Sequence, residues 1–193
     1  ASTIRYGTDK AALGEAQAVA RDPDAPSYGG KQMNIYRIKL ADLKPGEKYY
    51  YEVALEGGAT CAGSFRTLAE NPDEIRFISI TDTHKFETKE YFDEGVFSYD
   101  PAFIIHGGDM VEGTGTQKEQ YNFWFGSGEF IHNYPVVYAC GNHDFSEYFD
   151  AYVINTQTEE YGSAVPGNIA FDYGDVHFDL MDSNPWALFQ MNA

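Results

Sequence analysis

The pattern of hydrophobic and polar positions changes near residue 70 of the 193-residue chain. Before that point, apolar and polar residues alternate in short stretches, which is typical of strands with one buried face. The stretches that predict strands are Thr3–Gly7, Asn34–Leu40, Tyr49–Leu55 and Thr60–Thr67. Residues 1–70 therefore predict an all-β unit, and the polar, proline-containing segment Leu68–Glu74 predicts a linker after it.

Beyond the linker, the apolar residues form short continuous runs, which are typical of fully buried strands. Three such runs and two stretches that predict helices follow one another: Arg76–Ile80, Phe86–Phe97, Ala102–Ile105, Gln117–Ile131 and Pro135–Cys140. Two more strands, Asn168–Tyr173 and Val176–Met181, flank the hairpin signal Gly174-Asp175. This strand–helix–strand alternation predicts an α/β unit with a largely parallel sheet.

Each of the three buried runs is followed at once by residues that can bind metal. The three motifs are Asp82-Thr83-His84, Gly107-Gly108-Asp109 and Gly141-Asn142-His143-Asp144. Because parallel strands joined by helices end at the same edge of a sheet, these side chains should meet in one crevice. Oxygen and imidazole ligands that converge in this way suit a pair of divalent metals, so the sequence points to metal-assisted hydrolysis.

Each residue type has its own chemical reason to stand where it does. Asp82 and His84 are two residues apart, which places both side chains on one face at a strand end. Asp109 follows two glycines that let the backbone approach a ligand, and its carboxylate could bridge two metals; an Asx-turn or helix cap explains the same motif. Asn142 offers an amide oxygen without added charge, and His143 can donate a proton to substrate.

In this order, the three motifs resemble the signature blocks of the calcineurin-like metallophosphoesterase superfamily. The resemblance implies a site with two divalent or trivalent metal ions, of Fe, Mn or Zn. It also implies hydrolysis of a phosphate ester by in-line attack of a metal-bound hydroxide. In the resemblance, Asp82 and His84 would bind one ion, Asn142 would bind the second, and Asp109 would bridge the two. His143 would contact the transition state, and Asp144 would support His143.

Two further stretches indicate which members of the superfamily the chain resembles. Leu43–Val53 resembles the corner before strand F of a fibronectin type III-like sandwich, with Tyr49 as its tyrosine corner; an ordinary Pro-Gly turn is the alternative. Ile169–Phe178 is similar to a strand pair of the purple acid phosphatases, in which His177 would be a strand residue and not a ligand. Glu112 stands where those enzymes carry a metal-binding tyrosine. We therefore expect a purple-acid-phosphatase-like relative without a purple ferric centre.

The expected fold class is mixed. Residues 1–70 would form a partial fibronectin-like β-sandwich, and residues 71–193 the N-terminal part of an α/β metallophosphoesterase domain, itself a partial α/β/β/α sandwich. The sandwich is short of the roughly seven strands it needs, and no Gly-His-x-His follows His143. We therefore expect a chain truncated at both ends, which supplies only the first half of the metal site and is inactive alone.

Charge is distributed unevenly along the chain. The net charge is −17, and residues 71–193 carry all of it, with four Lys or Arg against twenty-one Asp or Glu. Because an acidic unit repels nucleic-acid phosphates, no duplex partner is expected. Most of the carboxylates are expected to form a solvated surface, and some could also gather cations that attract an anionic substrate. The expected substrate is the phosphate ester of a small molecule or of a phosphoprotein.

The remaining features concern location and function class. No apolar run reaches the ~18 residues of a membrane span, and Cys61 and Cys140 are expected to be free thiols. The chain opens with Ala1 and not methionine, which suggests a removed leader and favours a secreted or cell-envelope location. The fibronectin-like unit and the acidic surface leave one alternative open, a non-catalytic binding or adhesive protein with a degenerate metal site.

Overall fold

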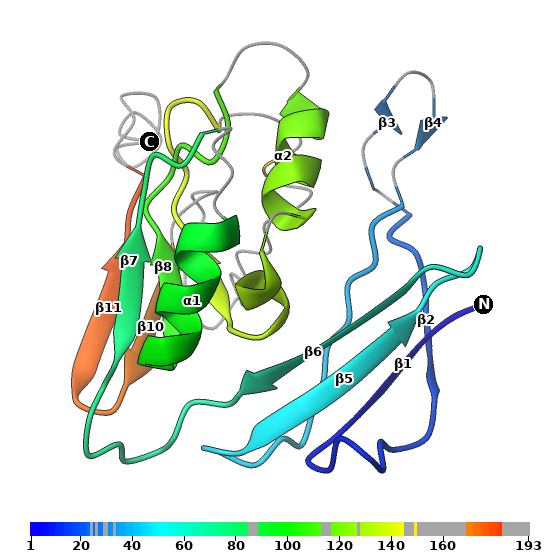
Figure 1. Cartoon of the computed structure of the whole chain (residues 1–193), viewed down its shortest axis with the longest axis horizontal. Helices are drawn as coiled ribbons and strands as arrows, with labels where there is room; N and C mark the ends of the chain where they lie inside the picture. Colours follow the sequence, from blue (N-terminus) through cyan, green and yellow to red (C-terminus); the bar gives the residue numbers. More distant parts are fainter. Residues whose placement is uncertain are drawn as a thin grey trace, which may run out of the picture.

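The computed structural model describes residues 1–23, 25, 27–28, 31–32, 34–84, 89–112, 117–126, 128–144, 149 and 169–182. Its N-terminal part is an antiparallel sheet with the strand order β2-β1-β5-β6, where the strands are β1 (Ser2–Gly7), β2 (Gln17–Val19), β5 (Lys48–Ala54) and β6 (Thr60–Arg66) (Figure 1). A separate short pair consists of β3 (Ser27–Tyr28) and β4 (Lys31–Gln32). Three of the four strands predicted before residue 70 are therefore confirmed.

Alternating side chains hold the long β5–β6 pair. Tyr49 lies opposite Phe65 in the register, and their rings stack with centroids 5.5 Å apart. The backbone N–H of Lys44 donates a hydrogen bond to the Tyr49 hydroxyl at 2.9 Å, which is the bond that defines a tyrosine corner. The corner is thus present. The strands described within residues 1–70 form this one sheet and the β3–β4 pair, so the complete sandwich stays a prediction.

The strand predicted over Asn34–Leu40 is wrong. In the described residues this segment makes a single isolated bridge, between Tyr36 and Arg21. A side-chain ion pair holds it in place instead, with Arg37 Nε 2.7 Å from Asp22 Oδ2. Alternation tells which face a side chain takes, but a strand also needs a partner whose backbone groups lie alongside it.

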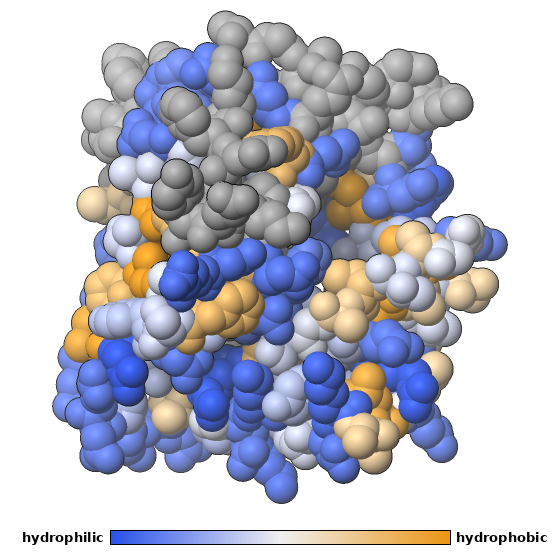
Figure 2. Space-filling view, in the orientation of Figure 1, coloured by the Kyte–Doolittle hydropathy of each residue, from blue (hydrophilic) through white to orange (hydrophobic). Residues whose placement is uncertain are grey.

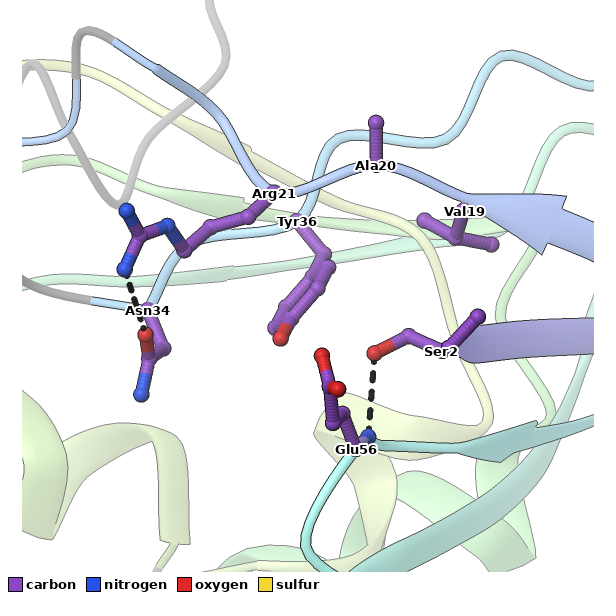
Figure 3. Close-up of a pocket in the computed structure, with 8 residues that line it drawn as sticks. Ser2, Val19, Ala20, Arg21, Asn34, Tyr36 and Glu56 are labelled. Atoms are coloured by element: carbon purple, nitrogen blue, oxygen red, sulfur yellow. Dashed lines mark hydrogen bonds between the residues drawn. The ribbon is translucent and has the colours of Figure 1, made fainter.

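A cavity of about 470 Å³ lies where this segment meets the end of the antiparallel sheet (Figure 3). On one side of the cavity, Arg21 donates to the side-chain oxygen of Asn34 at 3.2 Å. On the opposite wall, the Ser2 hydroxyl accepts the backbone N–H of Glu56 at 3.1 Å. The lining contains no residue of the three motifs, so this cavity is separate from the candidate metal site.

The α/β unit, residues 75–182, contains the parallel sheet predicted from the apolar runs. Its three strands follow the order β7-β8-β9 and run parallel: β7 (Phe77–Ile80), β8 (Phe103–His106) and β9 (Val136–Tyr138). The connecting helices are α1 (Lys89–Tyr99), α2 (Gln117–Gly126) and the 3-10 helix η1 (Glu129–His132).

The helix boundaries differ from those predicted. The first helix was expected from Phe86, which lies outside the described residues, and it extends two residues past its predicted end. The second was expected to continue to Ile131, but α2 ends at Gly126 and the chain resumes as η1. Gly126 and Gly128 explain the break, because glycine loses more conformational entropy in a helix than other residues do.

Different layers cover the two faces of the parallel sheet (Figure 1). On one face, Ile78 and Ile104 pack into a core with residues of both helices, including Val96 and Trp124. On the other face, Phe103 meets the antiparallel hairpin of β10 (Ile169–Tyr173) and β11 (Val176–Leu180), with the Phe103 ring about perpendicular to those of Phe171 and Phe178. This order of helices, sheet and second sheet is consistent with a metallophosphoesterase fold.

The two parts of the chain meet where β6 passes η1. The Tyr51 hydroxyl donates to the His132 carbonyl oxygen at 3.0 Å, and the Ser64 hydroxyl donates to the side-chain oxygen of Asn133 at 2.9 Å. Cys61 Sγ lies 3.2 Å from Nδ1 of His132. Both cysteines are free thiols, as expected, although Cys61 is only partly buried.

The face of the molecule in Figure 2 is mostly hydrophilic, with apolar side chains in small separate patches. Within the described residues, no helix is both long and apolar enough to cross a membrane.

Candidate metal centre

All three motifs lie at the C-terminal ends of the parallel strands, where they were predicted to meet. The loops after β7 and β8 are joined by backbone hydrogen bonds that continue beyond the strands. The Asp82 N–H donates to the Gly108 carbonyl at 3.0 Å, and the His84 N–H donates to the Asp109 carbonyl at 2.9 Å. Residues separated by a whole helix in the sequence are therefore held side by side.

Asp82, His84 and Asp109 form a cluster that can hold a metal ion. One ligand atom from each residue lies within 4.8 Å of the ligand atoms of the other two. Asp82 is exposed, and the other two are partly buried, so the cluster opens to solvent on one side. Its two carboxylates and one imidazole are ligands that zinc, iron and manganese accept.

The backbone at these positions is strained. Asp82, His84 and Asp109 have φ angles of 53°, 45° and 56°, in the left-handed region that residues other than glycine rarely adopt. Strain of this kind costs about 1–3 kcal/mol per residue and clusters at functional sites. Here the surrounding loops impose it on three residues that could share one ion.

Two motif glycines are required by close backbone packing. A Cβ at Gly108 would lie 2.6 Å from the backbone nitrogen of Gly141, closer than real Cβ contacts come, and Gly108 has a φ of 105°. A Cβ at Gly141 would collide with the Asp109 carboxylate. The second and third motifs therefore touch through their glycines, and the Asp109 carboxylate rests against the Gly141 backbone.

Backbone carbonyls orient the two motif histidines. His84 Nδ1 lies 3.1 Å from the Val111 carbonyl oxygen, and His143 Nδ1 lies 2.6 Å from that of Glu112. Because a carbonyl only accepts, each Nδ1 carries the proton. The two rings are nearly perpendicular, with centroids 5.2 Å apart. A histidine whose second nitrogen donates to a carbonyl is the usual arrangement at a metal site.

Asp144 holds the loop that carries these carbonyls. It is fully buried, and its carboxylate accepts backbone N–H groups at 2.6–3.3 Å from Asp109, Met110, Val111 and Gly141. Burial raises the pKa of the Asp144 carboxyl, and these N–H donors oppose the shift. These bonds fix the backbone around Asp109, and the support of His143 by Asp144 that the resemblance implies stays a prediction.

The remaining predicted residues come from the third motif, from the end of the second loop and from β11. The backbone N–H of His143 donates to Asp109 Oδ1 at 2.9 Å, which brings the third motif into contact with the second. Asn142 is exposed in the same turn. The Glu112 carboxylate is 4.0 Å from His84 Nδ1. His177 is a strand residue of β11, as expected, and its exposed ring pairs with Asp172 at 2.6 Å.

Sequence reasoning missed one residue, His106. The strand was predicted to end at Ile105, but β8 includes His106, whose side chain is fully buried. Its ring bonds to Thr83 of the first motif and to Gly108 of the second. The available signal was the period of two, because His106 shares a strand face with the buried Ile104.

Two solved structures share the fold of this chain. The chain is similar in fold to the purple acid phosphatase PPD1 from yellow lupin (Lupinus luteus) seeds, with a TM-score of 0.62, 14% identity, and coverage of 99% of this chain and 42% of that one. It is also similar to PhoD, with a TM-score of 0.62, 12% identity, and coverage of 95% and 45%. The chain thus spans less than half the length of either structure. No curated protein matches it in sequence. Residues 75–189 match the calcineurin-like phosphoesterase family, and the chain belongs to that family.

Proposed function

We propose that this chain forms the first half of a dinuclear metal site in a metal-dependent phosphoesterase, which hydrolyses phosphate esters. The observation that carries the proposal is the cluster of Asp82, His84 and Asp109 at the strand ends, with ligand atoms within 4.8 Å. Family membership supports the reaction class. The fold shared with a purple acid phosphatase and with PhoD supports the architecture alone, because sequence identity to both is low.

In this proposal, the residues present hold one metal ion of the Fe, Mn or Zn type and supply part of the ligands of a second. We assign Asp82 and Nε2 of His84 to one ion, because the Nδ1 proton of His84 is committed to the Val111 carbonyl. Asp109 lies between the first and third motifs, where a carboxylate can bridge two ions. We assign the Asn142 amide oxygen to the second ion. When bound, such ions lower the pKa of water to near ~7 and neutralise phosphoryl charge.

His143 is the residue we assign to substrate. Its Nδ1 proton is held by the Glu112 carbonyl, so Nε2 is the ring nitrogen for a phosphoryl or leaving-group oxygen. The Asp109 carboxylate accepts the His143 backbone N–H, which keeps the imidazole next to the cluster. The substrate class is a phosphate ester of a small molecule or of a phosphoprotein.

The proposal also divides the chain into two domains. Residues 1–70 would be an incomplete fibronectin type III-like domain, supported by the tyrosine corner at Tyr49. Residues 71–193 would be the N-terminal part of the phosphoesterase domain, and further histidines outside this chain would complete the second metal's ligands. The proposed location of the protein is secreted or in the cell envelope.

Metal binding by the chain itself is the first test. Calorimetric titration with Mn²⁺ should show binding, and Asp109→Asn should weaken it by more than the ~10–100-fold typical of losing an outer partner of a metal ligand. The control is Asp172→Asn, which removes an exposed carboxylate from β10 and should leave affinity unchanged.

The second test measures phosphatase activity. It uses a longer protein that contains this chain together with the histidines proposed to complete the ligands of the second metal. Asp109→Asn should abolish hydrolysis of p-nitrophenyl phosphate there, while Asp172→Asn should retain it. A wild-type protein that takes up no metal would favour the non-catalytic binding protein instead.

A further inference from the structure

We propose that His106 is a positioning residue of the metal site, acting through Thr83 and Gly108 to fix the loops that carry the candidate ligands. The inference rests on the proposed function in one respect, since it concerns the geometry of that metal site. It adds a role for a residue outside all three ligand motifs. His106 is the last residue of β8, the central strand of the parallel sheet.

Both ring nitrogens of His106 are used by protein groups. The backbone N–H of Gly108 points at Nδ1 from 3.2 Å, so this nitrogen must accept. In the neutral ring the proton therefore sits on Nε2, which lies 2.9 Å from the Thr83 hydroxyl and donates to it. A ring with both nitrogens engaged, and 0% exposed, is not itself a metal ligand. Its effect must pass through its two partners.

The two partners of His106 are next to all three residues of the cluster. Thr83 lies between Asp82 and His84, and Gly108 directly precedes Asp109. All three cluster residues have left-handed φ angles, which the loops must impose from outside. One side chain thus connects the first loop to the second at the point where both backbones are strained.

The surroundings of His106 make it a rigid link. Its ring meets Trp124 edge-on with centroids 4.9 Å apart, and it lies against Tyr138 of the neighbouring strand at 5.9 Å. Burial lowers the pKa of His106 to about 4, and the nearby Asp82 carboxylate opposes the shift. The ring stays neutral at neutral pH, so the same nitrogen donates and the same nitrogen accepts.

The experiment uses the whole chain, with Mn²⁺ alone as the probe. His106→Phe keeps an aromatic ring but loses both hydrogen bonds, and Thr83→Val removes only the partner hydroxyl. Each should weaken Mn²⁺ binding in calorimetry by ~10–100-fold, as losses behind a metal ligand usually do. Thr83→Ser keeps the hydroxyl, and this variant should bind Mn²⁺ within about twofold of wild type. Val96→Ala perturbs the same core away from the motifs and should also bind like wild type.

Hydrogen exchange of the metal-free chain supplies a second readout. The amides of Asp82 and His84 bond across the two loops, and they should exchange at least ~10-fold faster in His106→Phe than in Val96→Ala. Unchanged Mn²⁺ affinity in His106→Phe, or an equal loss in Val96→Ala, would overturn the inference. If His106→Phe does not fold, the contrast between Thr83→Val and Thr83→Ser decides.

A wild-type chain that takes up no Mn²⁺ would count against the proposed function and not directly against His106. Exchange then decides the inference alone. Faster exchange of the loop amides in His106→Phe than in Val96→Ala supports the positioning role, and equal exchange in the two variants overturns it.

Discussion

In the antiparallel sheet, neighbours such as β5 and β6 are joined by a short turn, and their register is set locally. In the α/β unit, β7, β8 and β9 run parallel and are joined through helices, so residues far apart in sequence end at one edge. The burial differs as well. The best-buried apolar side chains of the antiparallel sheet, Ile4 and Tyr49, keep 5–7% exposure, whereas Ile104 and Trp124 in the α/β unit keep 0–1%.

Buried ionisable groups follow the same division. Among the described residues, the buried polar side chains of the antiparallel sheet are Ser2 and Ser64, whereas the α/β unit buries His106, Asp144 and Asp182. A hydroxyl is cheap to bury once hydrogen-bonded, but a charge or an imidazole needs a dense, well-ordered shell. Among the described residues, the α/β unit is therefore the part whose core is deep enough to hold strained loops around a metal site.

The largest expected effect is a core truncation in the α/β unit. Trp124→Ala should lower the free energy of unfolding by about 3–5 kcal/mol, because it empties a site next to His106 and Phe130. Phe123→Ala, on the exposed side of the same helix and itself 37% exposed, should cost less than about 1 kcal/mol. Urea denaturation monitored by circular dichroism measures both; similar losses would show that the core is not where stability resides.

The second prediction concerns pH and the buried imidazole. The pKa of His106 falls to about 4 in the folded chain, against 6.5 for an ordinary histidine. The unfolded chain therefore binds more protons within this window, and stability is lost as pH falls from 6.5 toward 4, by up to about 3 kcal/mol.

His106→Gln should flatten this part of the stability profile, whatever its stability at neutral pH. His177→Gln, which changes an exposed histidine of the hairpin, should leave the slope intact. Denaturant midpoints recorded at several pH values give the comparison, and an identical slope in His106→Gln would assign the acid sensitivity to other groups.

The third prediction tests the contact between β6 and η1 that joins the two parts of the chain. A Cβ at Gly63 would collide with the His132 carbonyl oxygen and lie 2.7 Å from the Tyr51 hydroxyl. Gly63→Ala should therefore loosen the contact between β6 and η1 and cost about 1–3 kcal/mol. Cys61 should then react faster with a thiol reagent, since its contact with His132 opens.

The matched control for this variant is Gly95→Ala in α1, where an added methyl meets nothing within 4 Å. It should leave Cys61 reactivity unchanged, and alanine should stabilise the helix by about 0.5–1 kcal/mol. Unaltered Cys61 reactivity in Gly63→Ala would mean that the two parts hold together without this contact.

The sequence predicted the α/β unit better than the N-terminal part, and the reason is physical. Strands buried on both faces appear as continuous apolar runs, and the Asp and Gly residues after them mark the strand ends. The alternation over Asn34–Leu40 carries less information, because it does not specify a partner strand, and the segment forms no strand.

In the candidate site, the residues that form the cluster were predictable and those that hold it were harder to see. Asp82, His84 and Asp109 stand in recognisable motifs. His106 acts from within a strand, where a polar residue gives no motif, and the bonds of Asp144 to backbone N–H groups depend on loop shape. Side-chain identity can be read along the chain, but backbone acceptors and donors become visible only when the loops are folded.

The smallest expected effect returns to the antiparallel sheet. Tyr49→Phe removes the hydroxyl that accepts the Lys44 N–H and should cost about 0.5–1.5 kcal/mol, the usual value of one hydrogen bond. Tyr50→Phe, at the next position of β5, where Lys48 lies 5.6 Å from the ring centroid, should cost less than about 0.5 kcal/mol. Neither should alter Mn²⁺ affinity, because the corner is outside the α/β unit. A metal affinity that fell with Tyr49→Phe would show that the antiparallel sheet supports the site directly, and the division between the two parts would then have to be abandoned.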